Sequence, residues 1–354
     1  MTRASGLARI LFLVYVLLVA YASLYPLAGW RHVGLSPFAY LNAPWPRYIT
    51  GFDIAVNVVG YVPLGLLGVM ALHPRFRGVS AFVLALAGST ALSLVLEGAQ
   101  SYLPARVPTN LDVLCNIAGA AIGAALGQHF TPLIGGGPLS RLRAANFLSG
   151  TDVDFGLVLL ALWLFTQLNP AALLFGAGDL RDFFATFEGR ARRPEFFVLI
   201  EAFTTAANLV VVALLVSALA VPGRPVRTMV AGMVLAALVV HTAALAILMR
   251  AENVFAWLTQ GAQLGLAAGF AAALAALALP RVARLALAAV LLLAASVLVN
   301  LSPTNPYLAA TLKVWQQGHF LNFNGLTRLV SALWPLAAMG YLIYLASRRR
   351  DPVG

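Results

Sequence analysis

Apolar residues run along this 354-residue chain in long stretches that short polar segments separate. Ten of these stretches have the roughly 17 to 25 residues that an α-helix needs to cross the hydrocarbon core of a membrane. They cover residues 7–27, 54–72, 79–100, 111–129, 155–175, 196–221, 228–249, 254–279, 282–301 and 326–346. The pattern therefore predicts an all-α fold, a polytopic transmembrane helical bundle of about ten transmembrane helices.

The composition agrees with a membrane protein. Hydrophobic residues make up 61% of the chain and charged residues only 10%, whereas soluble domains are typically about half apolar and a quarter charged. The formal net charge of +11 comes from basic residues that are scattered at the ends of the predicted helices. They form no continuous stripe that could follow a phosphate backbone, so we expect no nucleic-acid partner and instead expect contact with anionic lipid.

Orientation follows from the arginines in alternate loops, because cytoplasmic loops carry an excess of Lys and Arg. When the mixed-charge loop 176–195 is set aside, the excess predicts that both termini are cytoplasmic. The first helix ends near Ala20-Tyr21-Ala22, a passable signal-peptidase pattern. The apolar run continues to Leu27, which favours an uncleaved helix.

The longest predicted cytoplasmic connection suggests a division of the chain. Residues 131–154 contain a Gly135-Gly136-Gly137-Pro138 sequence and several charges, a composition typical of a linker. On this interpretation residues 1–130 form a four-helix transmembrane domain and residues 155–354 a six-helix domain. The two parts show no self-similarity, so a transporter built from internal repeats gains no support.

Two predicted helices carry glycine at every fourth position. The glycines are Gly119, Gly123 and Gly127 on the fourth helix and Gly261, Gly265 and Gly269 on the eighth. Glycines at this spacing remove side chains from one helix face, so a neighbouring backbone can approach closely. This pattern predicts helix packing and says nothing about function.

Three polar clusters interrupt the apolar stretches of the first part, all at the predicted outer end of their helices. They are Asp53-x-x-x-Asn57, Glu97-x-x-Gln100 and Asp112-x-x-x-Asn116, and Arg106 lies in the loop between the last two. Residues three or four positions apart share one helix face, so each cluster points in one direction. Acids at membrane depth are costly, which makes these residues a candidate ligand-binding site, with Arg106 able to bind either carboxylate in bidentate fashion.

Helix capping is the alternative interpretation of these clusters. Thr50-x-x-Asp53 and Thr109-x-x-Asp112 both match a capping box, in which the two aspartates merely begin helices. Capping does not explain Asn57 and Asn116 one turn deeper. It also leaves Glu97 unexplained, because a negative charge is disfavoured near a helix C-terminus. We therefore favour a functional site.

The second part has a fainter polar pattern. Glu201 and His241 lie at similar predicted depth on successive helices and are secondary site candidates as a hydrogen-bonded pair. A structural role is the favoured interpretation, because interhelical hydrogen bonds of this kind are common. The outer segment 302–325 mixes aromatic and amide side chains, which favours a position in the headgroup layer over sugar binding.

The spaced polar residues of the first part resemble the signature of the VanZ-like family, over about residues 10–130. The resemblance lies in Glu97-x-x-Gln100, Arg106 and Asp112-x-x-x-Asn116-x-x-Gly119-x-x-x-Gly123, preceded by Asp53-x-x-x-Asn57 and Pro63-Leu64-Gly65. Some members carry an acid where this chain has Thr109. The resemblance implies a multi-pass protein of the bacterial inner membrane and cell envelope. The founding member is linked to reduced teicoplanin susceptibility, and the family has no settled reaction.

Three functions remain open at this point. The first is a non-enzymatic protein that binds a membrane lipid, a lipid-linked envelope precursor or a glycopeptide-type ligand at the outer leaflet. The second is an enzyme in which Asp53, Glu97 and Asp112 hold a divalent cation or act as acid and base on a lipid-linked phosphate. The third, ion-coupled transport, would require ionisable residues near the membrane midplane, whereas these acids lie near one surface.

No nucleophile elbow, P-loop, dinucleotide fingerprint or zinc motif occurs in the sequence, and the spacing of Glu201 and His241 matches no metal site. We therefore expect no cofactor and favour binding over catalysis.

Overall fold

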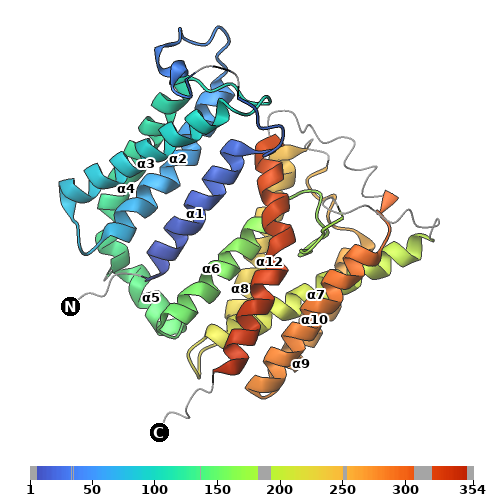
Figure 1. Ribbon diagram of the computed structural model, residues 1–354. Coiled ribbons are helices and arrows are strands. Elements are labelled where there is room, and N and C mark those ends of the chain that lie inside the picture. The colour runs from blue at the N-terminus through green and yellow to red at the C-terminus, as the bar shows by residue number, and fades with distance from the viewer. Residues whose placement is uncertain are drawn as a thin grey trace. The chain divides into compact units, whose positions relative to one another are not determined.

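The computed structural model describes residues 6–32, 34, 36–135, 137–181, 193–249, 253–306 and 321–348. The regular elements of these residues are eleven α-helices and one short 3-10 helix (Figure 1). Within this part of the chain, eight helices are long and apolar enough to cross a membrane. The prediction of an all-helical membrane bundle is confirmed, and each of the ten predicted stretches contains a helix.

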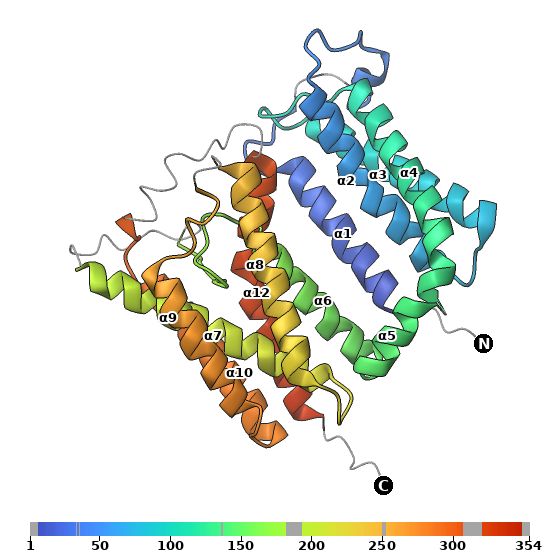
Figure 2. The same cartoon turned by 180° about the vertical axis from the view of Figure 1, so that it is seen from behind.

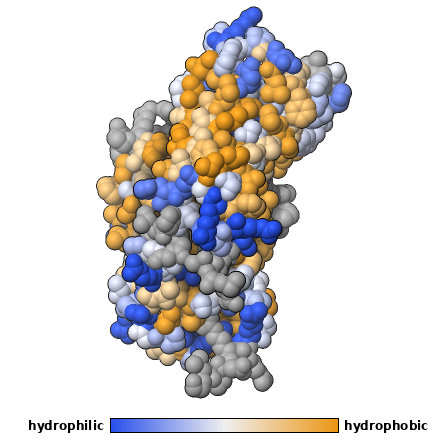
Figure 3. All heavy atoms as spheres, turned by 90° about the vertical axis from the view of Figure 1, so that its left-hand side faces the viewer, coloured by the Kyte–Doolittle hydropathy of each residue, from blue (hydrophilic) through white to orange (hydrophobic). Residues whose placement is uncertain are grey.

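Large apolar side chains remain exposed on these helices, as expected for surfaces that face lipid. Leu17 is 69% exposed and Val59 is 66% exposed. Figure 3 shows a broad area of hydrophobic side chains on the face that it displays. A patch of this kind would be an aggregation hazard in water, but it is the normal outer surface of a membrane protein.

The chain divides into two compact units, Met1–Phe155 and Gly156–Gly354. The first unit contains α1 (Gly6–Leu24), η1 (Ala39–Asn42), α2 (Gly51–Leu72), α3 (Gly78–Gln100), α4 (Asn110–Gly135), α5 (Pro138–Asn146) and the start of α6 (Thr151–Thr166). Its most extensive interface joins α2 to α4, and α1 and α3 pack against this pair (Figure 2).

The glycines of α4 explain the close approach of α2. A Cβ on Gly127 would lie 2.9 Å from the carbonyl oxygen of Leu66, and Gly123 faces the carbonyl oxygen of Val62 even more closely. Side chains on this face would therefore push the two backbones apart. The packing that the glycine spacing predicts is confirmed, with α2 as the neighbour.

The suggested linker 131–154 contains a helix, α5. Arg143 on α5 forms an ion pair with Asp154 in the first turn of α6. Asp154 also accepts a hydrogen bond from the backbone N–H of Leu7, at the start of α1. This stretch is consequently tied to the first unit by polar contacts that its composition does not reveal.

The second unit contains the rest of α6 together with α7 (Pro194–Leu219), α8 (Val226–Leu248), α9 (Gln260–Ala276), α10 (Arg281–Leu301) and α12 (Leu321–Ser347). Helix α7 is buried along most of its length and packs against α8, α9 and α10. The glycines of α9 face α7, and a Cβ on Gly265 would lie 2.7 Å from the carbonyl oxygen of Ala202.

The predicted helix over residues 155–175 ends early. Helix α6 stops at Thr166, and the following segment 167–181 is irregular, so the helical prediction for residues 167–175 is wrong. Much of the segment is nevertheless buried, with Phe175 fully inaccessible to solvent. Irregular backbone at membrane depth is tolerated only where its polar groups find partners within the protein or line a cavity.

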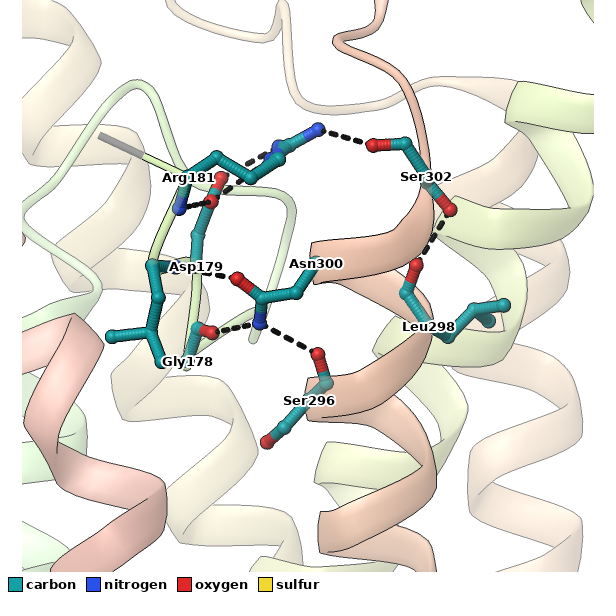
Figure 4. A network of polar contacts seen from close by, with 8 residues as sticks. Gly178, Asp179, Arg181, Ser296, Leu298, Asn300 and Ser302 are labelled. Atoms are coloured by element: carbon teal, nitrogen blue, oxygen red, sulfur yellow. Dashed lines mark hydrogen bonds and ion pairs between the residues drawn. The ribbon is translucent and has the colours of Figure 1, made fainter. Parts of the chain in front are cut away.

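Several of those partners come from α10 and α12. The Asn300 side chain of α10 accepts a hydrogen bond from the N–H of Leu180 at 2.8 Å and donates to the carbonyl oxygen of Gly178 at 2.6 Å (Figure 4). The N–H of Gly178 donates in turn to the carbonyl oxygen of Ser331 at 2.8 Å. One amide side chain thus replaces two of the hydrogen bonds that a continuous helix would supply.

The same segment ends in an ion pair. The guanidinium of Arg181 contacts the Asp179 carboxylate at 2.6 Å and donates to the carbonyl oxygen of Ser302 at 3.0 Å (Figure 4). Burial raises the pKa of the Asp179 carboxyl, but the hydrogen bonds and positive charge of Arg181 outweigh this effect and leave the pKa below its ordinary value. The charged form of Asp179 therefore orients Arg181, whose guanidinium attaches the segment to the residue after α10.

Candidate functional site

The polar residues of the first unit gather where α2 and α4 begin and α3 ends. We call this region the polar end; its predicted members are Asp53, Asn57, Glu97, Gln100, Arg106, Asp112 and Asn116. Neighbouring antiparallel helices bring these positions to one end of the bundle because α3 runs opposite to α2 and α4 (Figure 1).

Asp112 joins α4 to α2. The Asn57 side-chain amide donates to its carboxylate at 2.5 Å, and the backbone N–H of Asp112 donates to the Thr109 hydroxyl at 3.0 Å. Asp112 therefore caps the start of α4, as the alternative interpretation predicts, and also makes an interhelical contact that capping does not require. Its carboxylate is partly buried in this contact.

Glu97 is the most deeply buried carboxylate of the polar end, with only 5% of the residue exposed. Its carboxylate accepts a hydrogen bond from the backbone N–H of Thr109 at 3.2 Å. The negative charge of Asp112 lies close enough to act on that of Glu97. Thr109 thus contacts both acids. Its hydroxyl makes the capping contact with Asp112 that the sequence predicts, and its N–H makes a contact with Glu97 that the sequence pattern did not predict.

A second layer of polar groups lies deeper between the helices. The Asn116 side chain, 3% exposed, donates to the Ser93 hydroxyl at 3.0 Å. The hydroxyl of the buried Tyr61 also contacts Ser93. The side-chain oxygen of Asn116 is buried with no hydrogen-bond partner in the described part of the chain.

Sequence reasoning overlooked Ser93 and Tyr61. A signal was present, because Ser89, Ser93 and Glu97 follow one another at four-residue spacing and must share a face of α3. All three are buried on that face.

Arg106 has partners other than those that the sequence suggested. Its guanidinium donates to the carbonyl oxygens of Tyr25 at 3.0 Å and Ala22 at 3.1 Å, at the end of α1. Between described residues, no ion pair joins Arg106 to Glu97 or Asp112. Burial lowers the pKa of Arg106, and the nearby negative charge of Glu97 opposes that change. Arg106 therefore caps α1 and acts on Glu97 through space.

Two further predicted members have local roles. Asp53 is exposed, and its N–H and carboxylate contact the Thr50 hydroxyl at 3.1 Å and 2.5 Å, as in a capping box. Gln100 donates to the carbonyl oxygen of Ser23 at 3.1 Å and so attaches α3 to the end of α1. The structure thus brings together Asn57, Glu97, Asp112 and Asn116, while the other members support this group from its edge.

The segment between α1 and α2 lies over the acids. The hydroxyl of the buried Tyr40, in η1, donates to the carbonyl oxygen of Leu94 at 3.3 Å. Burial and the nearby charge of Glu97 both raise the pKa of Tyr40. Asn110 donates to the carbonyl oxygen of Ala43 at 2.8 Å. The segment therefore encloses the polar end, which explains why Glu97 is so little exposed.

The secondary candidates of the second unit, Glu201 and His241, both line one cavity of about 260 Å³. They do not form the expected pair: His241 contacts the backbone oxygen of Gln167 at 2.8 Å, and Glu201 contacts the Thr259 hydroxyl. Of the outer segment 302–325, residues 307–320 lie outside the described residues.

Among the residues that the structure describes, no three His, Cys, Asp or Glu side chains are arranged to hold a metal ion. No curated protein and no solved structure matches the chain. The family model described as VanZ/LLP1 matches residues 12–131, a range that contains every member of the polar end. The chain is a multi-pass membrane protein, and its residues 12–131 are therefore a VanZ-like domain.

Proposed function

We propose that the VanZ-like domain binds the head group of a membrane lipid, a lipid-linked envelope precursor or a glycopeptide-type ligand at its polar end, without catalysing a reaction. The observation that carries this proposal is the meeting of two carboxylates, Glu97 and Asp112, at one end of a membrane bundle. Within the described residues neither acid forms an ion pair.

The chemistry of the polar end favours a ligand rich in hydrogen-bond donors. Carboxylate oxygens accept hydrogen bonds, and the side-chain oxygen of Asn116 adds a buried acceptor. A buried acceptor without a partner costs about 1–3 kcal/mol, so the polar end has acceptor groups that its own residues do not satisfy. Hydroxyl or amino groups of a sugar-bearing or amino-bearing head group meet this requirement, whereas a bare phosphate would be repelled by the two acids.

The proposed location is the outer leaflet of the bacterial inner membrane. Both termini are cytoplasmic in this proposal, which rests on the arginine distribution, and the polar end then faces outward. A site in that leaflet meets envelope precursors and glycopeptides directly. This position fits a role in teicoplanin-type resistance.

Reporter fusions test the orientation. We expect an alkaline phosphatase, active only in the periplasm, to be inactive when fused after Arg348 and active when fused after Pro104 in the loop between α3 and α4. A cytoplasmic fluorescent reporter should give the opposite result at both points. The reversed pattern would place the polar end inside the cell and exclude an outer-leaflet ligand.

The alternative function is an enzyme that acts on a lipid-linked phosphate with a divalent cation held by carboxylates. Asp53 is one of the three acids assigned to that cation. It is exposed, and its carboxylate accepts a hydrogen bond from the Thr50 hydroxyl in the cap of α2. Glu97 and Asp112 are left as the acidic ligands, and Mg²⁺ in proteins is usually held by one or two carboxylates together with waters and substrate phosphates. Both functions would use these two acids, and metal analysis separates them.

Copurification provides the test of the proposed function. We expect wild-type protein, extracted with its surrounding membrane, to carry a lipid or glycolipid species that is enriched over the bulk membrane and no stoichiometric divalent metal. Glu97→Gln should reduce the enrichment about tenfold, the change that the loss of roughly 1.4 kcal/mol produces. Mass spectrometry of the extracted lipids and elemental analysis measure both quantities.

Glu195→Gln is the matched control, because Glu195 is an exposed acid in the other unit. It should keep the wild-type lipid profile. A bound metal that Glu97→Gln removes would favour the enzyme, and a profile that Glu97→Gln leaves unchanged would return Glu97 to a packing role.

A further inference from the structure

The cavity of the second unit lies outside the VanZ-like domain. Its volume is about 260 Å³, and its walls come from α7, α8, the irregular segment after α6, the segment that precedes α9 and Asn305 in the segment after α10. Most of the lining is apolar, with Phe197, Leu245 and Trp257 among the larger side chains. Ligand pockets in proteins typically combine such walls with a few convergent polar groups.

Glu201 is the charged group of this cavity. The residue is 9% exposed, and its carboxylate contacts the hydroxyl of Thr259, the residue that caps the start of α9. A single hydroxyl does not satisfy a carboxylate, which offers about four acceptor positions. The remaining acceptor capacity of Glu201 is available to a ligand.

His241 adds a second acceptor. The ring is 2% exposed, and its Nδ1 lies 2.8 Å from the backbone oxygen of Gln167. A carbonyl oxygen only accepts, so Nδ1 carries the hydrogen and Nε2 of the neutral ring keeps its lone pair. Nε2 has no hydrogen-bond partner in the described part of the chain. The ring lines the cavity, and the lone pair of Nε2 is free to accept a hydrogen bond. This indicates a ligand that carries a hydrogen-bond donor.

The irregular backbone after α6 provides an independent indication. Pro170, Leu173 and Leu174 from this segment line the same cavity. Its fold is fixed by polar contacts from other helices, such as the hydrogen bond from the Thr205 hydroxyl to the carbonyl oxygen of Leu174 at 3.0 Å. Broken helices in membrane proteins commonly supply the walls of binding sites.

We propose that this cavity binds a small primary ammonium ion with a short apolar body. The ammonium group carries a positive charge and three donors, which match the Glu201 carboxylate and His241 Nε2. None of the described lining residues is Lys or Arg, so an anion would meet only a like charge. Phe197 and Trp257 provide apolar and aromatic surface for the body of the ligand and for cation–π contact.

Calorimetry on the full-length protein in phosphatidylcholine nanodiscs tests the proposal, with empty nanodiscs as the blank. We expect saturable binding of hexylammonium and none of hexanoate, which has the same chain and the opposite charge. This comparison needs no variant. Equal or tighter binding of hexanoate, or an absence of saturable hexylammonium binding, would overturn the proposal.

Two variants locate the site. Glu201→Gln should weaken hexylammonium binding at least tenfold, because it removes the charge and keeps the shape, whereas Glu195→Gln, an exposed acid in the first turn of the same helix, should bind as wild type. Ala172→Phe should abolish binding by filling the cavity while leaving the carboxylate in place. Size-exclusion profiles check that each variant is folded. Wild-type affinity in both Glu201→Gln and Ala172→Phe would place the binding elsewhere.

The source of the ammonium group is decided in the same assay. Phosphatidylethanolamine in the nanodisc should compete with hexylammonium if the natural ligand is a lipid head group. Unchanged affinity in that lipid would instead indicate a free amine. Both results are consistent with an ammonium site, and they differ only in where the ligand comes from.

Discussion

Gly123→Leu is expected to prevent the VanZ-like domain from folding. Gly123 faces the backbone of α2, where a Cβ would overlap the carbonyl oxygen of Val62 and lie 3.0 Å from the backbone nitrogen of Leu66. Backbone atoms inside a helix cannot turn aside as the end of a flexible side chain can. Overpacking in a core usually costs about 1–3 kcal/mol, and a clash with helix backbone should exceed that range. The yield of monodisperse protein and its thermal stability measure the loss.

Gly88→Leu is the matched control. Gly88 lies on the exposed face of α3, with no atom of another part of the protein within 4 Å of the position where a Cβ would stand. The same substitution should leave stability unchanged or raise it by up to about 1 kcal/mol, because glycine is a poor helix former. If Gly123→Leu and Gly88→Leu behaved alike, the close contact between α4 and α2 would be absent.

Hydropathy and small-residue spacing are local signals, and they predicted most of the fold. The helical form of α7 and the close packing of the glycine face of α4 follow from patterns within one helix, whereas the burial of α7 and the choice of α2 as the neighbour of α4 do not. The end of α6 at Thr166 does not follow, because an apolar stretch indicates burial and not helical backbone. Gln167 and Asn169 indicate where the helix ends. Their side-chain oxygens accept hydrogen bonds from the backbone N–H groups of Phe175 and Ala171, which lie beyond the end of the helix.

The candidate site depends on contacts between helices, which a single sequence does not contain. Asp53 and Asp112 begin their helices with the same Thr-x-x-Asp pattern. Only Asp112 meets a side chain of another helix, the Asn57 amide, while Asp53 stays exposed. Capping therefore accounts for the contacts of Asp53, whereas Asp112 makes an interhelical contact that capping does not require, and its place in a functional site stays a prediction. The distinction depends on how α2 and α4 are packed.

Arg106→Ala is the second change with a large expected effect. The guanidinium holds the carbonyl oxygens of Ala22 and Tyr25, which no longer have partners within α1. Hydrogen bonds to charged groups contribute about 1.5–3 kcal/mol each, so the variant should lose several kcal/mol of stability. Arg47 is an exposed arginine of the segment between α1 and α2, and Arg47→Ala should change stability by less than about 0.5 kcal/mol. Denaturant unfolding of the purified proteins in detergent provides the measurement.

A double-mutant cycle separates the two roles of Arg106. If Arg106 only caps α1, its loss should cost the same in wild-type protein and in Glu97→Gln, because the amide leaves the end of α1 untouched. The position of Glu97, buried and within range of the positive charge of Arg106, predicts a different result. Arg106→Ala leaves a buried carboxylate without its nearby cation, and this penalty disappears once Glu97 is neutral. We therefore expect Arg106→Ala to be less harmful by about 1 kcal/mol or more in the Glu97→Gln background. Strict additivity would mean that the two residues stabilise the domain independently and that the polar end is not a single charge-coupled unit.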